Sequence, residues 1–280
     1  MDKAATLEHI QKRQRQWADG RGIQYNQANG PVLNLADNLF SALNPATASE
    51  FKAADGSELG TAGSATKMSS LHSSSALVCN VFDYWRGREL APLLRACGIQ
   101  DSLDDLRFEQ RFPTGLRGKP PNLDLLLSRN GKSPATAIEG KFTEPFQPRD
   151  HGGFSFSYFR SKGLWAGLER CRALAEAVNA QPDFHYLGVA QLLKHVLGLH
   201  RKFTADGFEL LYLWYDVPGS AAANEHRSEV ERFSQAISPE VRFRSMTYQA
   251  LFKSLVPCVQ GTSYAAYLRS RYFPEASRAS

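Results

Sequence analysis

The chain has 280 residues, 42% of them hydrophobic, which is enough for one large domain with a sizeable core. It contains no apolar run of about 18 residues, and its charged N-terminal stretch lacks an apolar leader segment, so we expect neither a membrane span nor a signal peptide. The net charge of +5 mildly favours a polyanionic partner, although many ordinary proteins are equally basic.

The four cysteines are scattered along the chain and form no CxxC pair. This spacing favours buried free thiols over disulfides or a zinc site, and it predicts a protein of the reducing cytoplasm. They are Cys79, Cys97, Cys171 and Cys258.

Residues 1–68 predict an N-terminal extension of helices and loops. Residues 3–17 carry a charged helical pattern, and short helices around 33–43 lie among glycines and prolines. A strongly helical region follows at 69–97, where three serines at 73–75 offer N-caps before an apolar run. Asn80 lies inside that run, so we expect a hydrogen-bonded buried amide, or else a side chain that faces the hairpin described next.

Three strands are predicted in succession, at 106–112, 120–127 and 137–142. The last two flank the sequence Arg-Asn-Gly-Lys at 129–132, in which Asn130 and Gly131 both tolerate positive φ and so favour a tight hairpin turn. With these as the two turn residues, Asp124 lies opposite Ala137. Pro134 cannot donate to the ladder and would widen the turn; a four-residue loop keeps the same faces, and an odd-length loop reverses them.

Charged side chains gather on one face of this hairpin. Because strand side chains alternate between faces, Glu139 and Lys141 share the face of Ala137 and therefore of Asp124. The diagonal from Asp124 to Glu139 is about 7–8 Å at Cα, which one cation can bridge. Two carboxylates and an ammonium suit an oxygen-liganded cation and a water nucleophile. Taken alone, the Glu-Gly-Lys sequence has a simpler interpretation as part of an edge or surface strand.

The second half of the chain alternates helices and strands. The aromatic side chains of a loop at 149–161 would either stack on bases or fill the core. Helices are predicted at 164–178, 186–199 and 221–237, and strands at 208–215 and 241–244. Gln191 and His195 lie one turn apart, whereas His195 and His200 do not share a helical face, which disfavours zinc. The complete order predicts a mixed α/β sheet flanked by helices.

Residues 247–280 predict basic, aromatic helices packed on the core. From 241 onward the chain has six basic residues against one acidic residue, with aromatic residues between them. Such a segment would clamp a phosphate backbone. The alternative is an amphipathic helix pair whose aromatic side chains belong to the core.

Asp124, followed after fourteen residues by Glu139-Gly140-Lys141, resembles the PD-(D/E)XK, or restriction-endonuclease-like, nuclease superfamily. The superfamily motif is an Asp at the start of one strand and Glu-X-Lys on the next; here Pro121-Asn122-Leu123-Asp124 replaces the nominal Pro-Asp pair. The resemblance covers about residues 70–245. It implies a restriction-endonuclease-like mixed β-sheet core at 69–246, flanked by helices in αβββααβαβ order, with N-terminal and C-terminal helical extensions.

The resemblance also implies an activity, namely Mg²⁺-dependent hydrolysis of DNA phosphodiester bonds, with Mn²⁺ as a substitute. Asp124 and Glu139 would bind the metal with the Gly140 carbonyl, and glycine there would let the substrate phosphate approach closely. Lys141 would orient or deprotonate the attacking water and offset charge on the phosphate.

Two further site residues follow from the resemblance. Gln191 matches the helical glutamine that contacts the DNA backbone or a metal-bound water. An acid upstream of the hairpin would supplement the metal site, and both Glu109 and Glu89 are candidates.

The implied protein is a restriction, defence or repair endonuclease, in which double-strand cutting would favour a homodimer. Two different functions stay open from the sequence. One is that of a nucleic-acid-binding or interaction module of the same fold without catalysis, and the second is that of an RNA-directed nuclease. No motif resembles a helicase, methyltransferase or P-loop.

Overall fold

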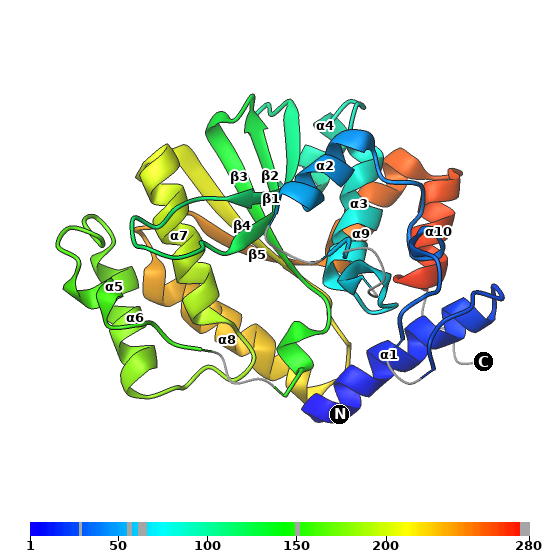
Figure 1. Ribbon diagram of the computed structural model, residues 1–280, viewed down its shortest axis with the longest axis horizontal. Coiled ribbons are helices and arrows are strands. Elements are labelled where there is room, and N and C mark those ends of the chain that lie inside the picture. Colours follow the sequence, from blue (N-terminus) through cyan, green and yellow to red (C-terminus); the bar gives the residue numbers. More distant parts are fainter. Residues whose placement is uncertain (28–29, 55–57, 61–65, 149–151, 275–280) are drawn as a thin grey trace.

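A five-stranded mixed sheet forms the centre of the molecule, in the order β1-β2-β3-β4-β5 (Figure 1). The computed structural model describes residues 1–27, 30–54, 58–60, 66–148 and 152–274. The antiparallel part comprises β1 (Asp105–Arg111), β2 (Asn122–Arg129) and β3 (Lys132–Lys141), and β4 (Phe208–Trp214) and β5 (Phe243–Thr247) continue it in parallel. Parallel neighbours need crossover connections, which the helices between them supply.

Helices cover both faces of the sheet. Before it come α1 (Lys3–Asp19), α2 (Pro45–Ala53), α3 (Ser74–Phe82) and α4 (Ala91–Ala96), with the 3₁₀ turns η1 (Leu35–Asn38), η2 (Lys67–Ser69) and η3 (Asp83–Trp85). After β3 come η4 (Glu144–Phe146), α5 (Ser157–Arg160), α6 (Glu169–Ala180), α7 (Val189–Phe203), η5 (Ala205–Gly207), α8 (Ala221–Ile237), α9 (Tyr248–Val259) and α10 (Ser263–Arg271). Helices α3 and α9 pack on one side, and α7 and α8 on the other (Figure 1).

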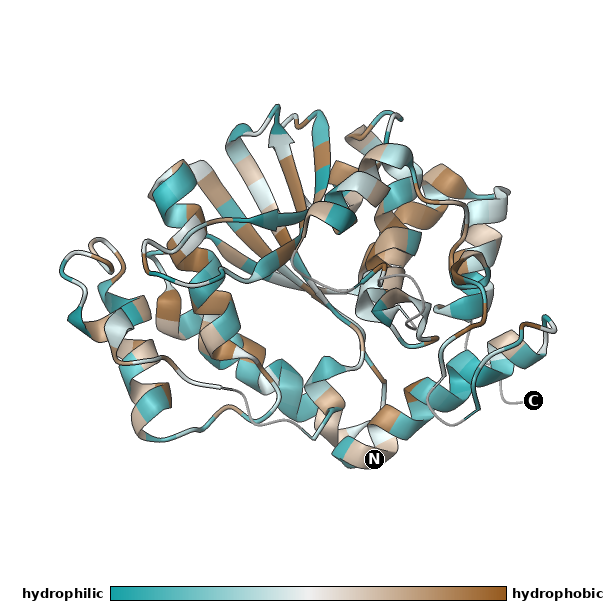
Figure 2. Cartoon of the chain, in the orientation of Figure 1, coloured by the Kyte–Doolittle hydropathy of each residue, from teal (hydrophilic) through white to brown (hydrophobic). Residues whose placement is uncertain are grey.

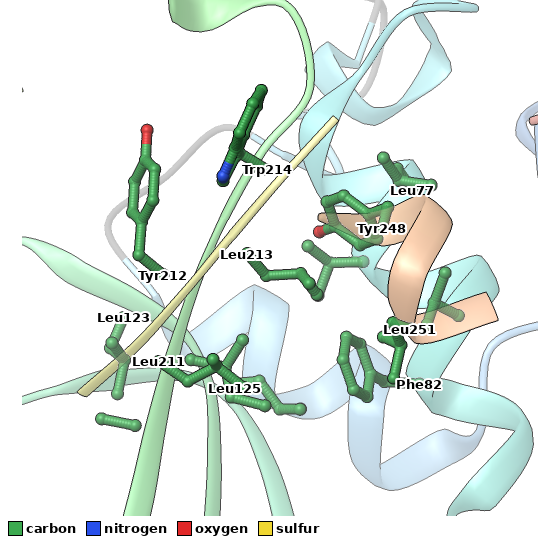
Figure 3. Close-up of a cluster of buried hydrophobic side chains, with 14 of the residues drawn as sticks. Leu77, Phe82, Leu123, Leu125, Leu211, Tyr212, Leu213, Trp214, Tyr248 and Leu251 are labelled. Carbon is green, nitrogen blue, oxygen red and sulfur yellow. The ribbon is translucent and has the colours of Figure 1, made fainter. Parts of the chain in front are cut away.

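Strand β4 is buried between the two helical layers. Leu211 and Leu213 point toward Tyr248 and Leu251, whereas Tyr212 points to the opposite side of the strand (Figure 3). Figure 2 shows the corresponding pattern in the ribbon, with hydrophobic residues along the strands and the inner surfaces of the helices. A nearly continuous apolar strand is typical of a sheet covered on both faces.

Several helices begin later than the sequence pattern predicts. Helix α6 begins at Glu169 and not at 164, because Gly163 and Gly167 adopt left-handed φ values of 74° and 75° before it. Helix α7 begins at Val189 and not at 186. The predicted region 69–97 is interrupted by η3, and α2 has no counterpart in the sequence prediction.

The β2–β3 hairpin has the predicted turn but a different register. Arg129 pairs with Lys132, as expected, and Asn130 and Gly131 have φ values of 51° and 73°. The register then shifts by two residues, so Ala137 lies opposite Leu126 and not opposite Asp124. The shift coincides with Pro134, which cannot donate a ladder hydrogen bond. Continuing the register puts Asp124 level with Glu139, and the even shift keeps the predicted faces.

The C-terminal helices belong to the hydrophobic core, so the phosphate-clamp interpretation is wrong for their aromatic residues. Six of them are buried: Tyr248, Phe252, Tyr264, Tyr267, Tyr272 and Phe273. Arg244 pairs with Glu209, and Arg271, only 1% exposed, donates to Asn38, Gln14 and backbone carbonyls. Residue 278 lies outside the described part. Within that part, no helix is long and apolar enough to cross a membrane.

Burial also decides the roles of Asn80 and of the aromatic loop. Asn80 is a buried amide that donates to the Asn38 carbonyl and the Tyr272 hydroxyl and accepts from the Phe40 N–H, so it does not face the hairpin. In the described part of the aromatic loop, Phe154 is buried, Tyr158 and Phe159 pack against the core, and Phe156 is 63% exposed, so most of these aromatic side chains serve the core.

Candidate active site

Glu139 and Lys141 lie at the end of β3 and form the centre of the site. Lys141 Nζ is 2.6 Å from Glu139 Oε1 and 3.2 Å from Gln191 Oε1. Gln191 Nε2 in turn donates to Glu139 Oε1 at 2.8 Å. The alternation of side chains along β3 therefore puts Glu139 and Lys141 on the same face of the sheet. Helix α7 packs on that face and contributes Gln191 to the site.

His195, one turn after Gln191 on α7, also contacts Glu139. Its Nε2 lies 3.2 Å from Glu139 Oε2, at ion-pair distance, and both side chains are almost completely buried. Within the described part of the chain neither atom has a hydrogen-bond partner. Glu139 thus has one oxygen held by Lys141 and Gln191, and a second oxygen with unused capacity to accept a donor or a cation.

Asp124 lies where β2 and β3 separate. The last paired residues of the ladder are Leu125 and Ile138, and beyond them Asp124 Oδ2 accepts the Gly140 N–H at 2.6 Å. Burial, followed by the negative charge of Glu139, raises the pKa of Asp124 well above its ordinary value. Two carboxylates this close oppose each other's ionisation, and a cation between them would remove that opposition.

The pKa values of the Glu139–Lys141 pair shift in the directions that favour both charges. Burial alone would raise the pKa of Glu139, but Lys141 and His195 outweigh it and lower the value to about 2. Burial alone would lower the pKa of Lys141, but the carboxylates of Glu139, Glu144 and Asp124 raise it. Lys141 is therefore held as a cation.

Of the two upstream acids, Glu109 lies near the site. The β1–β2 register puts it level with Asp124, its side chain is 8% exposed and its φ is 52°, unusual for a residue with a side chain. Burial, then Glu58 and Glu139, raise the pKa of Glu109 to about 7. Glu89, by contrast, is exposed to solvent.

Gly140 is required by packing between protein layers. A Cβ at this position would lie 2.4 Å from the Tyr248 hydroxyl and 2.8 Å from Val78 Cγ2. The expectation that glycine opens this position to a substrate phosphate is therefore wrong, because α3 and α9 occupy that side. The Gly140 carbonyl accepts from Ser74 Oγ at 3.1 Å and has a second lone pair for another contact.

A hollow of about 240 Å³ adjoins Lys141 and Gln191. Its walls are Lys141, Glu144, Pro145, Tyr186, Gly188, Gln191 and Tyr212. One wall is fixed by Glu229 of α8, whose carboxylate accepts the N–H groups of residues 185–187 at 2.7–2.8 Å. Glu229 thereby sets the position from which α7 begins.

Three contributors to the site escaped prediction from the sequence: Ser74, Glu229 and Tyr248. None lies in a motif, and each reaches the site only through the packing of a distant helix on the sheet. For His195 a signal was present, namely its spacing of four residues from Gln191, which puts both side chains on one face of α7.

The donor set fits a hard divalent cation. Mg²⁺ retains several waters and is commonly held by one or two carboxylates together with substrate phosphates. Asp124, Oε2 of Glu139 and the Gly140 carbonyl match that pattern. Among the described residues no group of three or more His, Cys, Asp or Glu side chains is arranged to hold a metal ion by itself.

The mixed sheet with a buried Glu-Gly-Lys strand end defines an α/β protein with a charged, partly closed site. Residues 4–273 match the family REase-ARP, described as Restriction Endonuclease associating with ARP. The match covers most of the chain, so the protein belongs to this restriction-endonuclease family. No curated protein and no solved structure matches the chain.

Proposed function

We propose that the protein is a Mg²⁺-dependent nuclease of the PD-(D/E)XK type that hydrolyses phosphodiester bonds in DNA. The observation that carries the proposal is the contact network of Glu139, Lys141 and Gln191 beside Asp124. A purely structural ion pair would not need a second carboxylate beside it. Burial and the charge of Glu139 raise the pKa of Asp124, so a cation bound between the two carboxylates would stabilise the ionised form of Asp124.

In this proposal Asp124, Glu139 and the Gly140 carbonyl hold the metal, with Glu109 as the supplementary acid. When bound, Mg²⁺ offsets negative charge on the phosphate and lowers the pKa of coordinated water. Mn²⁺ is expected to substitute for it.

Lys141 serves mainly as a donor and a positive charge, because three carboxylates keep it protonated. It orients the attacking water and stabilises the charge that develops on the phosphate. Gln191 fixes both partners of the pair, since its amide donates to Glu139 and accepts from Lys141.

The partners follow from the family and the chemistry. A restriction endonuclease acts on DNA, and the family description adds an association with ARP. Cutting both strands of a duplex would favour a homodimer. The four free cysteines support a location in the reducing cytoplasm.

The test is incubation of the full chain with plasmid, linear duplex, single-stranded DNA and RNA, each with Mg²⁺, with Mn²⁺ and with a chelator. The proposal expects metal-dependent cleavage of DNA that Asp124→Asn abolishes. Cleavage of RNA but not of DNA would show that the protein is an RNA-directed nuclease. Metal-independent binding without cleavage of any substrate would identify a non-catalytic binding module.

A further inference from the structure

Tyr248, the first residue of α9, has a completely buried side chain whose hydroxyl is directed toward the sheet (Figure 3). Within the described part of the chain this hydroxyl has no hydrogen-bond partner. Other buried tyrosines of the C-terminal region do have one, since Tyr264 donates to the Val81 carbonyl and Tyr272 accepts from Asn80. A buried hydroxyl without a partner carries an uncompensated desolvation cost, so it requires an explanation.

The hydroxyl lies beside Asp124 and Gly140. The point where a Cβ on Gly140 would stand is 2.4 Å from the hydroxyl oxygen and 3.5 Å from Asp124 Oδ2, so the two oxygens flank the same position. Burial, and then the charge of Asp124, raise the pKa of Tyr248 well above its ordinary value, which keeps the hydroxyl protonated as a donor. Asp124 Oδ2 already accepts the Gly140 N–H at 2.6 Å.

We infer that Tyr248 is a positioning residue for Asp124: its hydroxyl donates to the Asp124 carboxylate when that carboxylate holds the metal. The inference rests on the proposed metal site. Carboxylates that bind metals are themselves hydrogen-bonded by surrounding groups, which fix their orientation and strengthen metal binding.

This role connects the C-terminal helices to the chemistry. The side chain of Tyr248 reaches past Gly140 because that residue has no side chain, which accounts for the glycine between Glu139 and Lys141. Val78 of α3 fills the remaining space beside the same glycine.

The test is Tyr248→Phe in the full chain, which removes the hydroxyl and keeps the ring. Mn²⁺ affinity is measured by calorimetry, and unfolding is measured in chelator. We expect Mn²⁺ affinity to fall about 10- to 100-fold, the range found for such outer partners, with metal-free stability unchanged or raised. The matched control is Tyr264→Phe, which removes a paired hydroxyl away from Asp124 and should lower stability while leaving Mn²⁺ affinity unchanged.

The possible failures are distinguishable. If the wild-type chain binds no Mn²⁺ and cleaves nothing, the proposed function fails, and this inference fails with it. If the wild-type chain binds Mn²⁺ but Tyr248→Phe binds equally tightly, only the role of Tyr248 is overturned. A metal-free stability loss in Tyr248→Phe as large as that in Tyr264→Phe, without a selective loss of Mn²⁺ affinity, would assign the hydroxyl a structural role.

Discussion

Replacing Glu109 by glutamine is expected to stabilise the protein at alkaline pH and to change little in acid. The pKa of Glu109 is raised from 4.5 to about 7 by burial and by two neighbouring carboxylates. Below pH 4.5 the group is protonated in both the folded and the unfolded chain. As the pH rises from 4.5 to 7, the unfolded chain ionises first, so the wild-type protein loses stability over that window.

The size of the loss follows from the two pKa values. It reaches about 3 kcal/mol at pH 8, because each pKa unit corresponds to about 1.4 kcal/mol. Glutamine resembles the protonated acid and avoids the loss, so Glu109→Gln should exceed the wild type by up to that amount at pH 8 and by much less at pH 4.

Urea denaturation in chelator at pH 4 and pH 8 measures this difference. Glu89→Gln is the matched control, since Glu89 is exposed and a surface substitution of this kind changes stability by less than about 0.5 kcal/mol. A stability difference between Glu109→Gln and wild type that is the same at both pH values would refute the electrostatic reasoning. Addition of Mg²⁺ should stabilise the wild type more than Glu109→Gln if Glu109 supplements the metal site, and equal stabilisation would exclude that role.

Two further predictions concern packing. Gly140→Ala would put a Cβ against the Tyr248 hydroxyl, so overpacking should lower the free energy of unfolding by about 1–3 kcal/mol in urea titrations, and Tyr248→Phe should recover part of the loss. Arg271→Met would remove the donor to the buried Asn38 Oδ1 and to the Leu71 carbonyl, so thermal unfolding should report a loss of at least about 3 kcal/mol; a loss under about 1 kcal/mol would contradict that account.

The local signals of the sequence predict the strands and the turn well. Asn130-Gly131 defines the hairpin because only residues that accept positive φ fit both positions. The same signal does not report the two-residue shift at Ser133-Pro134, since the turn fixes where a ladder begins and not whether it continues without interruption. The even size of the shift is the reason that the predicted face of Glu139 and Lys141 matches the observed one.

Contacts between distant elements are the part that the sequence could not supply. The spacing of Gln191 and His195 indicates a shared helical face, but only the packing of α7 on β3 directs that face at Glu139. Tyr248 lies more than a hundred residues after Asp124 in a segment whose basic and aromatic composition pointed to nucleic acid. Its burial depends on how α9 packs against α4 and β5, which no local pattern encodes.

The most direct test of the central claim compares Lys141→Ala with Asp124→Asn for both DNA cleavage and Mn²⁺ affinity. Lys141→Ala should reduce cleavage about 10²–10⁴-fold and still bind metal, because both carboxylates remain. Asp124→Asn should lose cleavage and metal binding together, because it removes a charged ligand. If both variants cleave DNA at the wild-type rate, Asp124, Glu139 and Lys141 form a structural ion-pair network and do not form the active site.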